Sequence, residues 1–214
     1  VHYAGSKGRE YHSRDGHTGR EALSDRQKNA LAELNQKIEA LLSSDPYRPL
    51  RYIGSGIQYK HGQTTVTRQD IHGSIPENDS KAFLQTVREL LNEVDPENTI
   101  FRIEDTGKDI EIMLTVDGER EYDKGDGVAY LDQELELGLG SAASLICGDT
   151  GSDLPMVTRA DAMGGGDQVS TIFVTTDASL ARRVESLDVR HLVVSTPDIL
   201  VTALNRHAIR EGSS

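Results

Sequence analysis

Two aspartates follow an apolar run in the segment LICGDTGSDLPMV, residues 145–157. Asp149 comes directly after Gly148, and Asp153 follows in a loop of small, turn-prone residues. Mg²⁺ prefers oxygen ligands and keeps several of its waters, so one or two carboxylates are enough to hold it. The spacing therefore predicts a magnesium site at Asp149 and Asp153. The alternative is that Asp149 caps a helix and Asp153 is solvated, as often happens after a strand.

A lysine stands just before a predicted helix in the segment YDKGDG, residues 122–127. An ammonium group in this place can meet a phosphoryl group together with the amides of the helix N-terminus. The alternative is a solvated lysine in a glycine-rich turn. Lys124 becomes a candidate catalytic residue only in combination with the two aspartates.

The composition limits the class of partner. The 214 residues carry a formal net charge of −12, which argues against a nucleic acid or an anionic membrane as the main partner. The single cysteine, Cys147, excludes a disulfide within the chain and fits a reducing, cytoplasmic location. No segment reaches transmembrane length. We therefore expect a small-molecule ligand, no nucleic acid and no membrane.

The elements that would position these residues fall into two groups. Residues 24–117 predict an α+β module of helix, two strands, helix and two strands, and Ser24 and Gln27 form a capping-box pattern at its start. Residues 118–214 alternate helices with apolar strands, which is typical of a parallel sheet in an α/β fold. Ligands bind at the carboxyl ends of such strands. The expected strands are 144–149, 171–176 and 191–195, so that Asp149, Thr175, Thr176 and Ser195 lie at this edge.

The segments DKGDG and ICGDTGSD, residues 123–127 and 146–153, together resemble motifs III and IV of the haloacid dehalogenase (HAD) phosphatases. The nearer likeness is to the trehalose-6-phosphate phosphatases of nematode type. It extends over most of the chain through SKGRE, IGSGIQYK, DKGDGV, ICGDTGSDLPMV, TIFV and VVSTPDIL. The resemblance implies an α/β fold: a Rossmann-like HAD core, with a parallel sheet flanked by helices, and an inserted α+β cap domain. The expected domains are core at 1–23, cap at 24–117 and core again at 118–214.

The resemblance also implies roles for single residues. Asp149 and Asp153 would hold Mg²⁺, and Lys124 and Asp149 would be catalytic, with Lys124 neutralising the phosphoryl group. The implied reaction is hydrolysis of trehalose 6-phosphate to trehalose and phosphate through an aspartyl-phosphate intermediate. A relative that acts on another sugar phosphate remains an alternative, because the sugar that a cap domain selects cannot be deduced from its sequence.

Substrate contacts are expected from two places. The segment AGSKGRE matches the hinge between core and cap, which makes Lys7 and Arg9 candidate contacts. In the cap, strand alternation places Glu111 opposite its apolar neighbours, and Gln58 and Lys60 share a face for the same reason. These polar side chains would bind sugar hydroxyls if the helices cover only the other face. The alternative is an ordinary solvated sheet face.

The family's nucleophile motif, Asp-x-Asp-Gly-Thr after an apolar strand, has no match here. In SRDGHTG, residues 13–19, Ser13 stands at the nucleophile position, His17 replaces the threonine and no apolar strand precedes it. This segment is better interpreted as the turn before the first helix. We expect the chain to be a fragment of an active phosphatase whose motifs I and II lie on a preceding N-terminal segment or a separate fragment. The alternative is a non-catalytic sugar-phosphate-binding remnant.

Overall fold

The structure is a computed structural model that describes residues 1–116, 118–164 and 167–211. The chain divides into two compact units, Val1–Tyr122 and Asp123–Ser214. Their mixture of helices and sheets confirms the predicted α/β fold class. Residues 1–23 fall in the same unit as the α+β module, so their predicted grouping with residues 118–214 stays a prediction.

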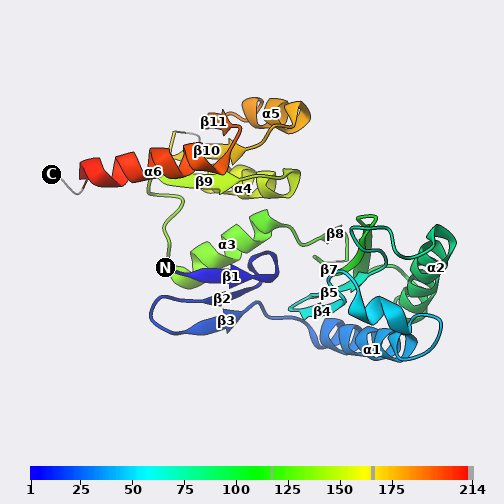
Figure 1. The fold of residues 1–214 in the computed structure, drawn as a ribbon. Helices are drawn as coiled ribbons and strands as arrows, with labels where there is room; N and C mark the ends of the chain where they lie inside the picture. The colour runs from blue at the N-terminus through cyan, green and yellow to red at the C-terminus, as the bar shows by residue number, and fades with distance from the viewer. Residues whose placement is uncertain (117, 165–166, 212–214) are drawn as a thin grey trace. The chain divides into compact units, whose positions relative to one another are not determined.

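The main sheet of the first unit is antiparallel, with strand order β4-β5-β7-β6 and β8 paired to β7. Two helices and a short 3₁₀ helix, η2, accompany it, and their order confirms the predicted module (Figure 1). The bounds are α1 Asp25–Leu42, η2 Arg48–Tyr52, β4 Ile57–Lys60, β5 Gln63–Thr67, α2 Glu77–Val94, β6 Phe101–Asp105, β7 Asp109–Val116 and β8 Arg120–Glu121.

The helices begin and pack largely as the sequence predicts. Gln27 donates its backbone N–H to Ser24 Oγ at 3.2 Å, and Ser24 donates its own to Gln27 Oε1 at 3.0 Å, which confirms the capping box. The apolar faces of both helices meet one face of the main sheet in a single core. Its most deeply buried members include Leu34, Ile38, Leu42, Phe83, Val87, Ile110, Ile112 and Leu114.

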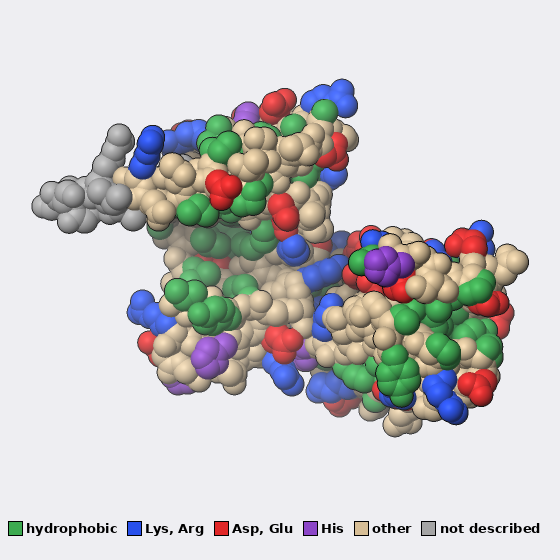
Figure 2. All heavy atoms as spheres, in the orientation of Figure 1, with side chains coloured by type: hydrophobic (Ala, Val, Ile, Leu, Met, Phe, Trp, Pro, Cys, Tyr) green, Lys and Arg blue, Asp and Glu red, His purple; other side chains and the backbone are tan. Residues whose placement is uncertain are grey.

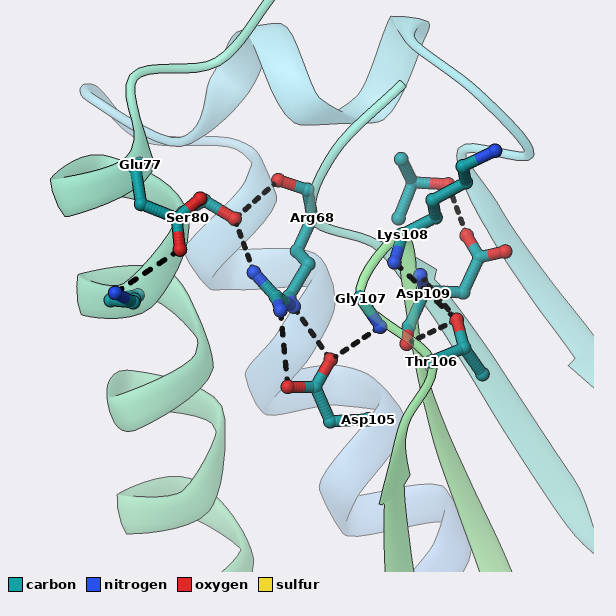
Figure 3. A network of polar contacts seen from close by, with 10 residues as sticks. Arg68, Glu77, Ser80, Asp105, Thr106, Gly107, Lys108 and Asp109 are labelled. Carbon is teal, nitrogen blue, oxygen red and sulfur yellow. Dashed lines mark hydrogen bonds and ion pairs between the residues drawn. The ribbon is translucent and has the colours of Figure 1, made fainter. Parts of the chain in front are cut away.

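A buried arginine at the end of β5 ties this sheet to α2 (Figure 3). Arg68 donates from Nε and Nη2 to the two carboxylate oxygens of Asp105, at 2.7 and 3.1 Å. Its Nη1 donates to Ser80 Oγ at 2.6 Å, and Ser80 Oγ donates to the Arg68 carbonyl at 2.9 Å. We call Arg68, Ser80 and Asp105 the arginine clamp. It links the end of β5, the first turn of α2 and the end of β6.

A second, smaller sheet occupies the start of the chain. Its strands β1 (Tyr3–Gly5), β2 (Glu10–His12) and β3 (Thr18–Arg20) are antiparallel and adjacent in order. The turn predicted at residues 13–19 exists in part: it joins β2 to β3 rather than leading directly into α1, and residues 18 and 19 belong to β3. Ser13 donates its N–H to the His17 carbonyl at 2.7 Å. Strands this short, with few apolar residues, leave little periodic signal.

The second unit carries the predicted parallel sheet. Strands β9 (Ser144–Gly148), β10 (Val169–Val174) and β11 (Arg190–Val194) run in the order β11-β10-β9. The helices are α3 (Lys124–Leu135), α4 (Leu154–Gly164), α5 (Ala178–Glu185) and α6 (Pro197–Glu211), with the short 3₁₀ helix η3 (Gly151–Asp153) before α4. One core contains Leu154, Val157, Ala160, Phe173, Leu180 and Val184.

Some apolar surface of the second unit is exposed. Leu145 in β9 and Leu192 in β11 are 46% and 49% exposed, and hydrophobic side chains also lie on the surface of α6 (Figure 2). Within the described residues, β9 is an edge strand of its sheet. No helix in residues 1–116, 118–164 or 167–211 combines the length and apolar character needed to cross a membrane.

Candidate active site

The candidate phosphoryl-binding residues of the second unit meet in space. Lys124 Nζ forms an ion pair with Asp153 Oδ1, although the two residues belong to α3 and η3. The Asp153 side chain is 6% exposed, whereas that of Lys124 is 36% exposed. Asp153 is therefore a buried anion with a half-exposed cation beside it, and the alternative of a solvated Asp153 is wrong.

The local sequence explains how α3 brings Lys124 to this place. Asp123 caps the helix, because its Oδ1 accepts the N–H groups of Gly125 and Asp126 at 2.8 and 3.1 Å. A Cβ at Gly125 would lie 2.5 Å from the Pro155 carbonyl oxygen in α4, so only glycine allows this approach. The DKGDG pattern thus starts a helix and seats it against α4, with Lys124 beside Asp153.

Asp153 also organises the loop that carries Asp149. Its Oδ2 accepts hydrogen bonds from the backbone N–H groups of Asp149 and Thr150, both at 3.0 Å, and from Thr150 Oγ1 at 3.1 Å. Burial alone would raise the pKa of Asp153, but the hydrogen bonds from Lys124 and these amides outweigh it and lower the pKa to about 2. The carboxylate is therefore ionised throughout the neutral range.

A glycine at the end of β9 permits this loop to fold back. A Cβ at Gly148 would lie 2.6 Å from Asp153 Cβ and 2.9 Å from the Phe173 ring, which is closer than real Cβ contacts. Asp149 follows at the carboxyl end of the strand and is exposed. The loop thus presents one exposed carboxylate and one buried carboxylate at the edge where ligands bind in parallel sheets.

The donor chemistry of this loop fits a hard divalent cation. Asp149 is exposed, and Asp153 Oδ1 accepts only the Lys124 ammonium among its described hydrogen bonds, so that oxygen keeps a lone pair. No three His, Cys, Asp or Glu side chains among the described residues converge as a metal cluster. A cation here would take the two carboxylates and complete its shell with water, as Mg²⁺ commonly does.

The first unit carries the predicted polar sheet face. In the strand register, Gln58 lies opposite Thr65, and Thr65 lies opposite Glu111, so the three side chains share one face. Lys60 lies opposite Gln63 on the same face. Ile110, Ile112 and Leu114 of β7 point to the helix-covered side, which confirms the alternation on which Glu111 was selected. Their contact with substrate stays a prediction.

Lys7 lies over this polar face. Its Nζ is 2.8 Å from Sδ of Met113, which is opposite Gln63 in the register. Ser6 and Lys7 have φ values of 53° and 58°, in the left-handed region that non-glycine residues rarely adopt. Such backbone strain often accompanies functional positions. A thioether is a weak acceptor for an ammonium group, so Lys7 keeps donor capacity for a ligand.

Arg9 is engaged within the protein. The residue is 4% exposed, and its guanidinium pairs with Glu21 at 2.6 Å, donates to the Leu114 carbonyl at 3.2 Å and stacks 3.8 Å from the Tyr122 ring centre. These contacts favour a positioning role over a direct substrate contact. The prediction that Arg9 binds substrate remains without support from this geometry.

Two polar residues of this face, Gln63 and Thr65, were not predicted from the sequence. Gln63 and Thr65 are 6% and 4% exposed and bond to the predicted residues Glu111 and Lys60. The unusual feature of β5 is its polar sequence, Gln-Thr-Thr-Val-Thr, in a strand that is buried along its whole length. A polar sequence in a fully buried strand indicates a side-chain hydrogen-bond network.

Fold and site together define a phosphatase-like α/β protein of HAD type. The chain belongs to the family described as "Trehalose-6-phosphate phosphatase, C-terminal", whose model matches residues 1–200. This match confirms the resemblance found in the sequence.

Similar proteins agree with this assignment. The chain is 32% identical over 219 residues to the trehalose-phosphatase of Brugia malayi, covering 98% of this chain and 44% of that protein. It is 28% identical over 218 residues to the alpha,alpha-trehalose-phosphate synthase [UDP-forming] 2 of Caenorhabditis elegans, covering 98% of this chain and 18% of that protein. The chain thus spans less than half the length of either relative.

A solved structure confirms the fold. Crystal form 3 of the Aspergillus fumigatus trehalose-6-phosphate phosphatase matches with a TM-score of 0.50 at 18% identity, over 97% of this chain and 68% of that one.

Proposed function

We propose that this chain carries the metal-binding and sugar-binding residues of a Mg²⁺-dependent phosphatase that hydrolyses trehalose 6-phosphate. The observation that carries the proposal is the ion pair between Lys124 and Asp153, next to Asp149 at the carboxyl end of β9, in a member of this family. The names of the relatives supply the substrate.

The three candidate residues of the second unit, Lys124, Asp149 and Asp153, have different roles. The Lys124 ammonium offsets the negative charge of the phosphoryl oxygens, and its pairing with Asp153 holds it at the site. Asp149 and Asp153 would hold Mg²⁺, which supplies further charge neutralisation to a phosphoryl group. Asp153 also fixes the Asp149 backbone through its amide hydrogen bond. The nucleophile implied by the resemblance is a residue other than these.

The α+β module serves as the cap that selects the sugar. Gln58 and Lys60 of β4 and Glu111 of β7 share one sheet face, and amide, ammonium and carboxylate groups together can donate to and accept from sugar hydroxyls. Lys7 adds an ammonium over the same face. A disaccharide phosphate offers many hydroxyls and one dianion, which this set of groups matches.

Phosphate release tests the proposal. The protein that contains this chain, including any segment that precedes Val1, would be assayed with trehalose 6-phosphate, glucose 6-phosphate and an aryl phosphate, each with Mg²⁺ and with a chelator. We expect release that requires Mg²⁺ and a kcat/KM highest for trehalose 6-phosphate. The Asp188→Asn variant removes an exposed charge of the second unit and serves as a control with unchanged activity.

Other outcomes would redirect the assignment. A higher kcat/KM for another sugar phosphate would keep the phosphatase and change its substrate. Binding of trehalose 6-phosphate without release of phosphate would indicate a non-catalytic sugar-phosphate-binding protein. Release that a chelator does not reduce would contradict the metal assignment.

A further inference from the structure

We propose that Gln63 and Thr65 of β5 are positioning residues for sugar-phosphate recognition, an inference that rests on the proposed function. They hold Glu111 and Lys60 in fixed positions through one hydrogen-bonded chain and do not themselves touch the ligand. The residues that would touch it lie on the neighbouring strands β7 and β4.

The contacts form an unbroken chain across three strands. Gln63 Nε2 donates to Glu111 Oε2 at 3.0 Å and to Thr65 Oγ1 at 3.2 Å. Lys60 Nζ donates to the same Thr65 Oγ1 at 3.5 Å. The threonine hydroxyl therefore receives both the amide and the ammonium, and β5 connects the carboxylate of β7 to the cation of β4.

The two positioning residues are more deeply buried than the two residues that would contact the ligand. Gln63 and Thr65 are 6% and 4% exposed, whereas Lys60 and Glu111 are half-buried. A ligand on this face would reach Lys60 and Glu111 before it could reach β5. Buried polar side chains are costly unless they are hydrogen-bonded, and here the bonds run to the residues that would bind ligand.

These hydrogen bonds would improve ligand binding because they restrict the Lys60 and Glu111 side chains before the ligand arrives. Lysine and glutamate side chains lose much rotamer entropy when a ligand immobilises them, and a side chain that is already held loses less. Thr65 is β-branched and therefore stiff at χ1, which makes it a firm acceptor. Loss of this hydroxyl should weaken ligand binding by roughly fivefold to tenfold, the effect of about one net hydrogen bond.

The neighbouring threonine provides a matched control. Thr64 lies on the same strand, is completely buried and also bonds through its hydroxyl, to Asn35 Oδ1 at 2.6 Å. Its side chain points to the helix-covered face, away from Glu111. Thr64→Val and Thr65→Val are therefore the same chemical change in the same strand, on opposite faces.

The experiment measures trehalose 6-phosphate binding by calorimetry with a chelator, which stops turnover. It also measures kcat and KM in Mg²⁺ for that substrate and for an aryl phosphate, and the urea midpoint. Thr65→Val and Gln63→Met should raise the Kd and KM for trehalose 6-phosphate about fivefold to tenfold and leave the aryl phosphate values within about twofold. Thr64→Val should change only the urea midpoint and leave the Kd and KM for trehalose 6-phosphate unchanged. Thr65→Ser keeps the hydroxyl and should restore binding to within about twofold of the unmodified protein.

Two results would overturn the inference while leaving the proposed function standing. One is unchanged trehalose 6-phosphate binding in folded Thr65→Val and Gln63→Met. The other is equal weakening in Thr64→Val and Thr65→Val, which would indicate a general loss of stability. If Thr65→Val does not fold, unchanged binding in folded Gln63→Met alone would overturn the inference. If the unmodified protein neither binds trehalose 6-phosphate nor prefers it to the aryl phosphate, the proposed function fails, and this inference fails with it.

Discussion

Replacement of Arg68 by methionine should destabilise the first unit by about 2–3 kcal/mol. The change keeps an unbranched side chain but removes the hydrogen bonds to Asp105, at 2.7 and 3.1 Å, and to Ser80, at 2.6 Å. Removing one partner of a fully buried ion pair costs about 3–5 kcal/mol. Asp105 is 27% exposed and keeps the Gly107 amide at 2.9 Å, so water and this amide recover part of the loss.

The effect of Arg68→Met should also depend on pH. The hydrogen bond from Arg68 lowers the pKa of Asp105 below its usual 3.8, against the opposing effect of burial. A carboxyl group with a lowered folded-state pKa stabilises the protein above its unfolded-state pKa, and this stabilisation is lost as the pH falls through the folded-state value. The difference between the unmodified protein and the variant should therefore be full at pH 7 and shrink below about pH 4.

Urea unfolding at pH 7 and pH 3 would measure both effects. Far-UV circular dichroism follows the transition, and amide hydrogen exchange in α2 assigns it to the first unit. Lys81→Met is the control, because Lys81 and Glu77 form an exposed ion pair on the same helix and its loss should leave the midpoint unchanged. A loss below about 1 kcal/mol at pH 7, or a loss that is equal at both pH values, would refute the role of the clamp.

Three further substitutions test the site. Glu111→Ala should raise the KM for trehalose 6-phosphate much more than that for an aryl phosphate; equal effects in steady-state assays would remove Glu111 from the sugar site. Asp153→Ala should abolish Mg²⁺-dependent phosphate release, and unchanged turnover would exclude it as a metal ligand. Gly148→Ala should destabilise the second unit by about 1–3 kcal/mol, because its Cβ would meet Asp153 and the Phe173 ring. A urea midpoint equal to that of the unmodified protein would contradict this close approach.

The sequence predicted the elements whose signals are local and periodic. The capping box at Ser24 and the alternation around Glu111 depend on neighbouring residues, and both are confirmed. The three-stranded sheet at the start of the chain could not be predicted as a sheet, since its strands are too short to show a period.

The candidate site was predictable in residue type but not in geometry. The spacing of Asp149 and Asp153 indicated a metal site, and the position of Lys124 before a helix made it a candidate together with them. That Lys124 and Asp153 form an ion pair depends on the packing of α3 against α4, which a linear pattern does not contain. For the same reason Gln63 and Thr65 were missed: their role comes from pairing between β5 and its two neighbouring strands.

Binding of Mg²⁺ to the loop of Asp149 and Asp153 can be measured on this chain by NMR titration of the ¹⁵N-labelled protein. We predict saturable shifts centred on the amides of Asp149 and Thr150, which both bond to Asp153, and their loss in Asp149→Asn. The net charge of −12 makes weak general binding of the cation the competing result. Shifts that do not saturate, or that spread over acidic side chains elsewhere, would contradict a metal site in this loop.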